Sequence, residues 1–157
     1  MRGFDVRILG LSRSLTADEY ADEMHPLSDM AKVLGQADII VLAIASSKTT
    51  KHLMNAATFS AAKKGSLFIN VTRGETVDQT ALRQALESGH LASAFIDVTE
   101  PEPLPKYDPL WDAPNLFISP HAAGGGSTKG GGRIAYVVRE NIERLQSGRP
   151  FIHLIKT

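Results

Sequence analysis

Five short apolar runs constrain the fold of this 157-residue chain more than any other feature. The first four are nearly continuous and rich in valine, isoleucine and leucine, without a regular alternation of polar residues. This pattern is typical of strands that are buried on both faces of a parallel sheet. The runs are 5–11, 38–44, 66–71, 92–98 and 116–119.

Helix signals lie between these runs, so that strands and helices alternate along the chain. Ser28, Asn55 and Asp78 are candidate N-caps, because short polar side chains accept hydrogen bonds from the first free N–H groups of a helix. Gly65 and Gly89 are suited to end the second and third helices. The alternation predicts a doubly wound α/β domain with short crossovers.

Two later segments complete the outline. Residues 99–115 contain five of the eight prolines, which predicts an extended surface loop and not a helix or a central strand. Residues 133–150 carry apolar side chains at helical spacing and predict an amphipathic helix. Gly130–Gly132 precede it, and we expect them to delay its start.

The composition excludes several classes of partner and chemistry. Lysine plus arginine and aspartate plus glutamate both number 17, so no excess of positive charge favours a nucleic acid or an anionic membrane. The chain has no cysteine, which excludes disulfides and thiolate chemistry. No apolar run approaches the ~20 residues of a membrane span, and the start lacks the apolar core of a secretion signal. A cytoplasmic protein is the default expectation.

Residues that directly follow the apolar runs are the first candidates for a site, because ligands of open α/β sheets bind at the carboxyl ends of the strands. Arg73, Asp97, Glu102 and His121 could converge there although they are far apart in sequence. Together such groups can bind a carboxylate, orient an imidazole and move a proton. Each alone is weak evidence, since an arginine after a strand is more often a solvated charge and a lone histidine more often structural.

The order of several motifs strengthens the case. The segment from residue 66 to residue 124 resembles the nucleotide-binding domain of the D-isomer-specific 2-hydroxyacid dehydrogenases, and the similarity extends over nearly the whole chain. The resemblance implies a Rossmann-like fold. The motifs that carry it are Asn70 to Gly74, Val77-Asp78, Ala81-Leu82, Asp97-Val98, Glu102-Pro103 and Pro120-His121.

This resemblance implies hydride transfer between a nicotinamide cofactor and a small 2-keto or 2-hydroxy acid. His121 would protonate the carbonyl oxygen and take the proton back in the reverse direction. Glu102 would fix the imidazole tautomer, Arg73 would grip the substrate carboxylate, and Asp97 would bind the nicotinamide carboxamide. Glu100 competes for the partnership with histidine, but the family places that acid five positions after the strand aspartate, which selects Glu102.

The resemblance also indicates where the cofactor would lie. At the end of the first strand, Ser12 stands where relatives that use NAD carry an aspartate, which accepts hydrogen bonds from the adenosine ribose, and Arg13 and Ser14 follow it. A cation and two hydroxyls suit a 2′-phosphate, so we expect NADP to be preferred, with NAD as the alternative. The further expected contacts to the cofactor are Ala45, Thr50, Val71, Thr72, Arg73, Asp97, His121 and Gly124.

One family feature lies outside this sequence. The Gly-x-Gly-x-x-Gly turn that holds the cofactor pyrophosphate should precede the first strand and is absent. We therefore expect an incomplete sheet and a truncated form with weak or no activity alone. The expected division is a partial nucleotide-binding domain in 1–133 and a C-terminal helix and tail in 134–157, which in the family return toward the substrate domain.

Two other functions compete with the dehydrogenase. A non-catalytic nucleotide-binding remnant or regulatory module is consistent with the missing turn. A P-loop NTPase is not, because serine and threonine precede Lys129 and the chain contains no Gly-Lys pair followed by a hydroxyl residue. The oligomeric state stays open, with a possible homodimer because relatives commonly pair through this domain.

Overall fold

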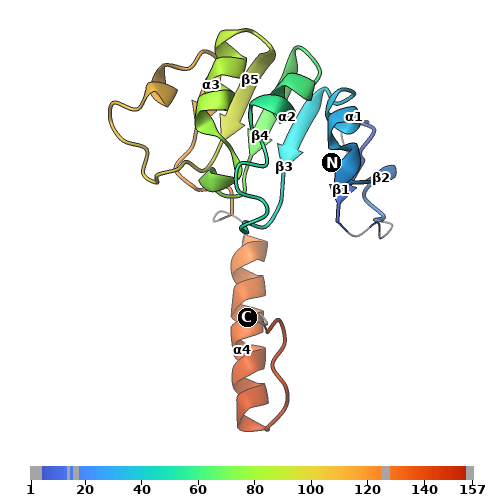
Figure 1. Ribbon diagram of the computed structural model, residues 1–157. Coiled ribbons are helices and arrows are strands. Elements are labelled where there is room, and N and C mark those ends of the chain that lie inside the picture. Colours follow the sequence, from blue (N-terminus) through green and yellow to red (C-terminus); the bar gives the residue numbers. More distant parts are fainter. Residues whose placement is uncertain (1–4, 14, 16–17, 125–127, 155–157) are drawn as a thin grey trace. The chain divides into compact units, whose positions relative to one another are not determined.

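The computed structural model describes residues 5–13, 15, 18–124 and 128–154. The chain forms two compact units, Met1–Pro120 and His121–Thr157, and each is described here by itself. The expected functional division at residue 133 is a different boundary and stays a prediction. Figure 1 shows the first unit as a sheet with helices packed on it.

The first unit alternates strands and short helices, as the sequence predicted. Short 3-10 turns lie at Leu27–Asp29, Gly74–Thr76 and Pro109–Asp112. The strands and helices of both units are β1 (Leu9–Ser12), β2 (Glu23–Pro26), α1 (Met30–Leu34), β3 (Ile39–Leu42), α2 (Ala56–Ala61), β4 (Ser66–Asn70), α3 (Gln79–Glu87), β5 (Leu91–Ile96), β6 (Leu116–Ile118) and α4 (Thr128–Gln146).

The strands form two separate sheets, and every described strand pair is parallel. β1 pairs with β2, while β3, β4, β5 and β6 pair in that order. Within the described residues no ladder joins β1 to β3, so each strand keeps one open edge. The predicted α/β class with an incomplete sheet is confirmed.

β2 was not predicted, because its sequence Glu-Met-His-Pro contains no apolar run. It forms where the chain returns beside β1, with Leu9 opposite Glu23. Arg7 adds a side-chain hydrogen bond to Glu23, and this bond lowers the pKa of the Glu23 carboxyl below its usual value. Pairing with β1 therefore stabilises this strand, although its own sequence does not favour one.

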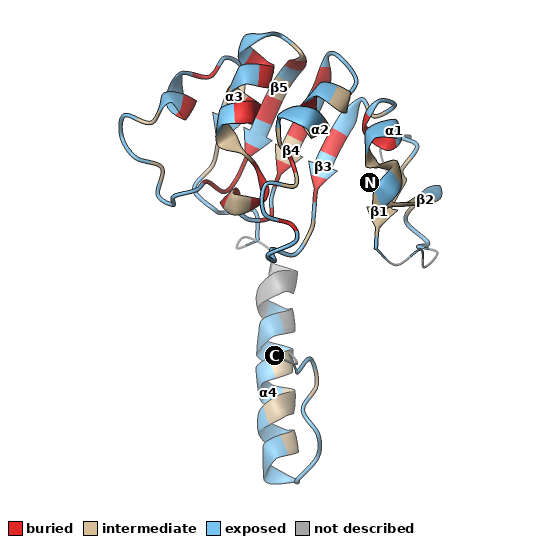
Figure 2. Ribbon diagram, in the orientation of Figure 1, coloured by how far each residue is buried: buried red, intermediate tan, exposed pale blue. Residues whose placement is uncertain are grey.

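The core of the first unit lies between one face of the β3–β6 sheet and the helices α2 and α3. Phe59 of α2 meets Phe68 of β4 edge to face, with ring centroids 5.2 Å apart. Leu82 of α3 is fully buried in the same cluster. Figure 2 shows buried residues, in red, along β3, β4 and β5 and on α3.

The opposite face of this sheet is apolar but exposed. Between 37% and 64% of the surface of each of its largest side chains is accessible. The prediction of strands buried on both faces is therefore wrong for this face, because the described residues cover only the other one. The exposed side chains are Ile39, Val41, Leu67, Phe95 and Phe117.

Two of the three predicted N-caps are confirmed. The Asn55 side chain accepts from the N–H groups of Ala57 and Thr58 in a capping box. The Asp78 side chain accepts from the N–H groups of Thr80 and Ala81. Ser28 is not a cap, since it lies within the 3-10 turn that precedes α1 and that helix has no side-chain cap. The Met30 N–H, which a Ser28 cap would bind, already donates to the Leu27 carbonyl within the 3-10 turn.

The second unit consists of α4 and a tail that folds back on it. The expectation of a delayed helix start is wrong, because α4 begins at Thr128 and contains all three glycines. Asn141 fastens the tail from both sides, donating to the Ile152 carbonyl at 3.2 Å and accepting from its N–H at 2.9 Å. No helix in the described part of the chain is long and apolar enough to cross a bilayer.

Candidate functional site

The carboxyl ends of β3 and β4 form a pocket of about 490 Å³. Four of the predicted site residues, Ala45, Val71, Thr72 and Arg73, lie in its lining. The fold thus brings together, as the sequence predicted, residues that follow two different strands. The remaining lining residues are Ala43, Ile44 and Ser46.

Thr50 lies beneath the loop that follows β3 and is buried. Its hydroxyl donates to the Ala45 carbonyl at 3.1 Å and accepts from the Ser47 N–H at 2.8 Å. These bonds close the 45–50 turn on itself. Thr50 thus supports the turn that carries the lining residues Ala45 and Ser46, and its expected contact with a cofactor ribose stays a prediction.

The loop after β4, which carries Arg73, rests on a buried polar network. The Asn70 side chain accepts from the Thr72 N–H at 3.0 Å and from the Thr72 hydroxyl at 2.7 Å. The Arg73 carbonyl accepts from the Thr76 hydroxyl at 2.6 Å and from the Asn70 amide at 3.2 Å. Such satisfied buried networks fix a backbone in one conformation.

The guanidinium of Arg73 stays at the surface of this network. The Arg73 residue is exposed, and its Nη1 donates to the neighbouring Thr72 carbonyl at 2.7 Å. A fixed backbone with an exposed, forked donor is the arrangement that binds a carboxylate in two-point fashion. Asn70 belongs to the recognised motif, whereas Thr76 was missed because no sequence signal marks a hydroxyl that bonds to a loop carbonyl.

Asp97 follows β5 and is 2% exposed. Its N–H donates to the Asn70 carbonyl at 2.9 Å, and its carboxylate accepts a short hydrogen bond from the Ser119 hydroxyl. The residue therefore joins the ends of β4 and β6. Ser119 was considered only as a strand-end residue, and its bond to Asp97 was not predicted.

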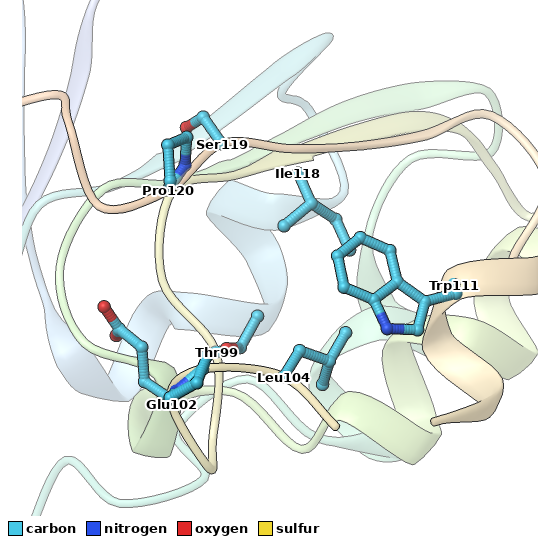
Figure 3. A pocket seen from close by; sticks show the side chains of 8 residues that line it. Thr99, Glu102, Leu104, Trp111, Ile118, Ser119 and Pro120 are labelled. Carbon is cyan, nitrogen blue, oxygen red and sulfur yellow. The ribbon is translucent and has the colours of Figure 1, made fainter. Parts of the chain in front are cut away.

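Glu102 lines a second pocket of about 490 Å³, beside the proline-rich loop. Figure 3 shows Leu104, Ile118 and Trp111 grouped on one side of this pocket, with Glu102 on the other side and Ser119 and Pro120 on a separate strand end above it. Glu100 is not among the residues that line it. The choice of Glu102 over Glu100 as the partner of the histidine stays a prediction.

His121 and Gly124 open the second unit and are described with it. The backbone of His121 has a φ of 53°, in the left-handed region that few non-glycine residues adopt. It follows directly on Ser119 and Pro120 at the end of β6. The predicted partnership of His121 with Glu102, and any role of Gly124 toward a cofactor, stay predictions.

The predicted adenosine-end residues are only partly described. Ser12 ends β1, opposite Pro26 of β2, and Arg13 follows it with an exposed side chain. Ser14 lies outside the described residues. Within the described part of the chain no cluster of acidic or histidine side chains could hold a metal ion.

Comparison with known proteins identifies the family of the chain. Residues 1–123 match the family model described as D-isomer specific 2-hydroxyacid dehydrogenase, NAD binding domain. The chain belongs to this family. The recognised resemblance and the predicted type of domain are thereby confirmed.

Individual dehydrogenases and reductases show the same relationship. Glyoxylate reductase from Korarchaeum cryptofilum is 34% identical over 150 residues, which make up 94% of this chain and 44% of that protein. The D-isomer specific 2-hydroxyacid dehydrogenase from Xanthobacter autotrophicus, solved with NADPH and MES, has a TM-score of 0.83 at 36% identity. That alignment covers 94% of this chain and 60% of the other.

A third dehydrogenase gives a similar fit. The NADPH-dependent glyoxylate/hydroxypyruvate reductase from Sinorhizobium meliloti, solved with NADP and sulfate, has a TM-score of 0.87 at 28% identity. The alignment covers 99% of this chain and 49% of that one. Among the first curated relatives of the family, the chain spans only 36–44% of their length.

Proposed function

We propose that this protein supplies the cofactor-binding and catalytic groups for NADPH-dependent reduction of a small 2-keto acid to the 2-hydroxy acid. The observation that carries the proposal is the pocket at the ends of β3 and β4, whose rim residue Arg73 is held by a buried network. Membership of the 2-hydroxyacid dehydrogenases supports the reaction type. Glyoxylate and hydroxypyruvate are the first substrates to test, because reductases among the relatives carry those names.

The chemistry of the pocket fits a nicotinamide cofactor. Small side chains at Ala43, Ala45 and Ser46 leave room for a flat ring against the backbone. Asp97, whose buried carboxylate accepts from Ser119, would supply an acceptor for a carboxamide N–H. When bound, the cofactor supplies the hydride, and every other requirement of the reaction falls to side chains of the protein.

Arg73 would bind the substrate carboxylate and draw electron density from the adjacent carbonyl. His121 would donate a proton to the carbonyl oxygen as carbon accepts the hydride, which leaves a hydroxyl and a neutral imidazole. Glu102 would accept from the other ring nitrogen and stabilise the protonated form before transfer. Substrate, hydride and proton together account for the 2-hydroxy acid.

NADP preference rests on the residues at the end of β1. Arg13 is exposed at this strand end, where a 2′-phosphate would meet a cation. The structures from Xanthobacter autotrophicus and Sinorhizobium meliloti were solved with NADPH and NADP, and this agrees with the proposed preference. NAD remains the alternative cofactor.

A matched pair of histidine variants tests the mechanism. His121 and His153 are both exposed and have φ values of 53° and 56°, which asparagine also adopts readily. NADPH oxidation by the purified chain is measured with glyoxylate and with hydroxypyruvate, and NADPH binding is measured separately. We expect weak binding and slow turnover, with turnover lowered roughly 100- to 10,000-fold by His121→Asn and unchanged by His153→Asn.

A non-catalytic nucleotide-binding module is the second candidate, because the family model that matches residues 1–123 describes an NAD binding domain and binding alone requires no turnover. It predicts NADPH binding without turnover and equal behaviour of the two histidine variants. The same assay therefore separates the two functions.

A homodimer is also proposed, since open strand edges and an apolar sheet face favour association. The exposed face described above supplies such a surface. Sedimentation of the purified chain over a range of concentrations tests this, and a monomer at every concentration contradicts it.

A further inference from the structure

The side-chain amide of Gln79 pairs with the peptide group of Glu100 in both directions. Gln79 Nε2 donates to the Glu100 carbonyl at 2.7 Å, and the Glu100 N–H donates to Gln79 Oε1 at 2.9 Å. An amide side chain used in this way replaces a neighbouring strand for one residue. The segment after β5 is therefore fastened to the first residue of α3.

A second contact fastens the same two segments. A Cβ placed on Gly74 would lie 2.1 Å from the backbone carbon and oxygen of Thr99 and 2.6 Å from the Glu100 nitrogen. Only glycine permits this approach, since real Cβ atoms do not come so close to backbone. Within the segment after β5, the Thr99 hydroxyl donates to the Pro101 carbonyl at 2.9 Å.

These contacts relate two residues of the proposed mechanism. Arg73 directly precedes Gly74, and Glu102 lies two positions after Glu100. The segment that carries the carboxylate-binding arginine and the segment that carries the acid are thus joined at adjacent points. A shift of one segment against the other would change the separation of Arg73 and Glu102.

Gln79 contributes little else to the fold. It is only partly buried and is absent from the apolar cluster under α3. The start of α3 is capped by Asp78, whose Oδ1 accepts from Thr80 and Ala81. Removing the amide of Gln79 therefore leaves both the helix cap and the core intact.

We propose that Gln79 is a positioning residue that holds Glu102 in register with Arg73 through the peptide group of Glu100. This inference rests on the proposed function for its effect on rate, but the fastening itself does not. Its replacement loosens the Glu100–Pro103 segment and lowers kcat, while the NADPH pocket at the ends of β3 and β4 stays unchanged.

The test uses Gln79→Met, which keeps the length of the side chain and removes both hydrogen bonds. Gln84→Met is the matched control, because Gln84 lies on the exposed side of the same helix. Amide hydrogen exchange of Glu100, followed by NMR in the purified chain, is expected to accelerate roughly tenfold in Gln79→Met, as for loss of one hydrogen bond. It is expected to stay at the wild-type rate in Gln84→Met.

Turnover is measured on the same proteins. We expect kcat to fall roughly 10- to 100-fold in Gln79→Met, because small displacements of catalytic groups cost that much. The Kd for NADPH and the urea midpoint should match those of Gln84→Met. In Gln79→Glu the acceptor remains, and protonation of the new carboxyl restores the donor, so Glu100 protection should increase as the pH falls toward about 4.

The outcomes separate this inference from the proposed function. Unchanged Glu100 exchange in Gln79→Met overturns the fastening, whether or not the chain turns over substrate. Faster exchange with an unchanged kcat overturns the positioning role. A wild-type chain that oxidises no NADPH contradicts the proposed function and with it the effect on rate, while the exchange measurement still decides whether Gln79 holds the segment.

Discussion

The hydroxyl of Thr76, a side chain with no exposed surface, donates a 2.6 Å hydrogen bond to the backbone carbonyl of Arg73. The same carbonyl accepts from the Thr76 N–H at 3.2 Å. One buried residue thus holds the backbone from which an exposed guanidinium projects. Replacing Thr76 therefore tests how far the binding of substrate by Arg73 depends on the stability of this loop.

Thr76→Val keeps the shape of the side chain and removes its hydroxyl. We expect a loss of about 0.5–1.5 kcal/mol in the free energy of unfolding, because the Arg73 carbonyl loses one of its three hydrogen-bond donors. The KM for the 2-keto acid should rise as Arg73 loosens. Urea unfolding and initial rates measure the two effects, with the exposed Thr80→Val as control. Equal stability of the two variants would show that the network does not hold the loop.

Thr50→Val tests the turn after β3. The hydroxyl of Thr50 bonds to the carbonyl of Ala45, which lines the pocket, so its loss should loosen the turn that carries Ala45. We expect weaker NADPH binding by roughly threefold or more, from about 1 kcal/mol of lost hydrogen bonding. Fluorescence titration of NADPH gives the Kd, and Thr49→Val serves as the exposed neighbour. An unchanged Kd in Thr50→Val would show that this turn does not contribute to NADPH binding.

Two glycine variants should have opposite signs. Gly74→Ala places a Cβ 2.1 Å from the Thr99 backbone and should lower stability by about 1–3 kcal/mol or more. Gly132→Ala, inside α4 with no atom within 4 Å of the added carbon, should stabilise that helix by up to about 1 kcal/mol. Urea unfolding followed by circular dichroism measures both. A tolerated Gly74→Ala would contradict the close contact of the two segments.

Arg13→Glu tests the cofactor preference. The substitution places a negative charge where a 2′-phosphate is expected, so the Kd for NADPH should rise tenfold or more, from about 1.5–3 kcal/mol of lost charged interaction. The Kd for NADH should stay near its wild-type value. Isothermal titration with both nucleotides measures this. An equal rise in the Kd for NADPH and for NADH would show that Arg13 attracts both nucleotides by charge and does not recognise the 2′-phosphate.

The sequence predicts the elements that carry their own local signal. Asn55 and Asp78 were identified as caps because the polar residue and the helix it opens lie side by side in the chain. β2 was missed because its pairing depends on β1, and Ser28 was misplaced because a 3-10 turn begins one residue earlier. Gly130–Gly132 stay helical, which shows that intrinsic propensity was overridden there.

The site divides in the same manner. Arg73, Glu102 and His121 stand in motifs that are read directly from the sequence. The bonds of Thr50, Thr76 and Gln79 are to backbone groups of other loops, and no residue pattern identifies such a partner in advance. Their positions depend on how the loops meet after the strands have paired.

The exposed side of the β3–β6 sheet changes how the stability of this chain is measured. Phe95, Phe117 and their neighbours keep large apolar surfaces in contact with water. Any molecule that lies over them binds the folded state and not the unfolded one, and so raises the melting temperature by mass action. The melting temperature of this protein therefore depends on its concentration and on any binding molecule in the solution, as well as on its own sequence.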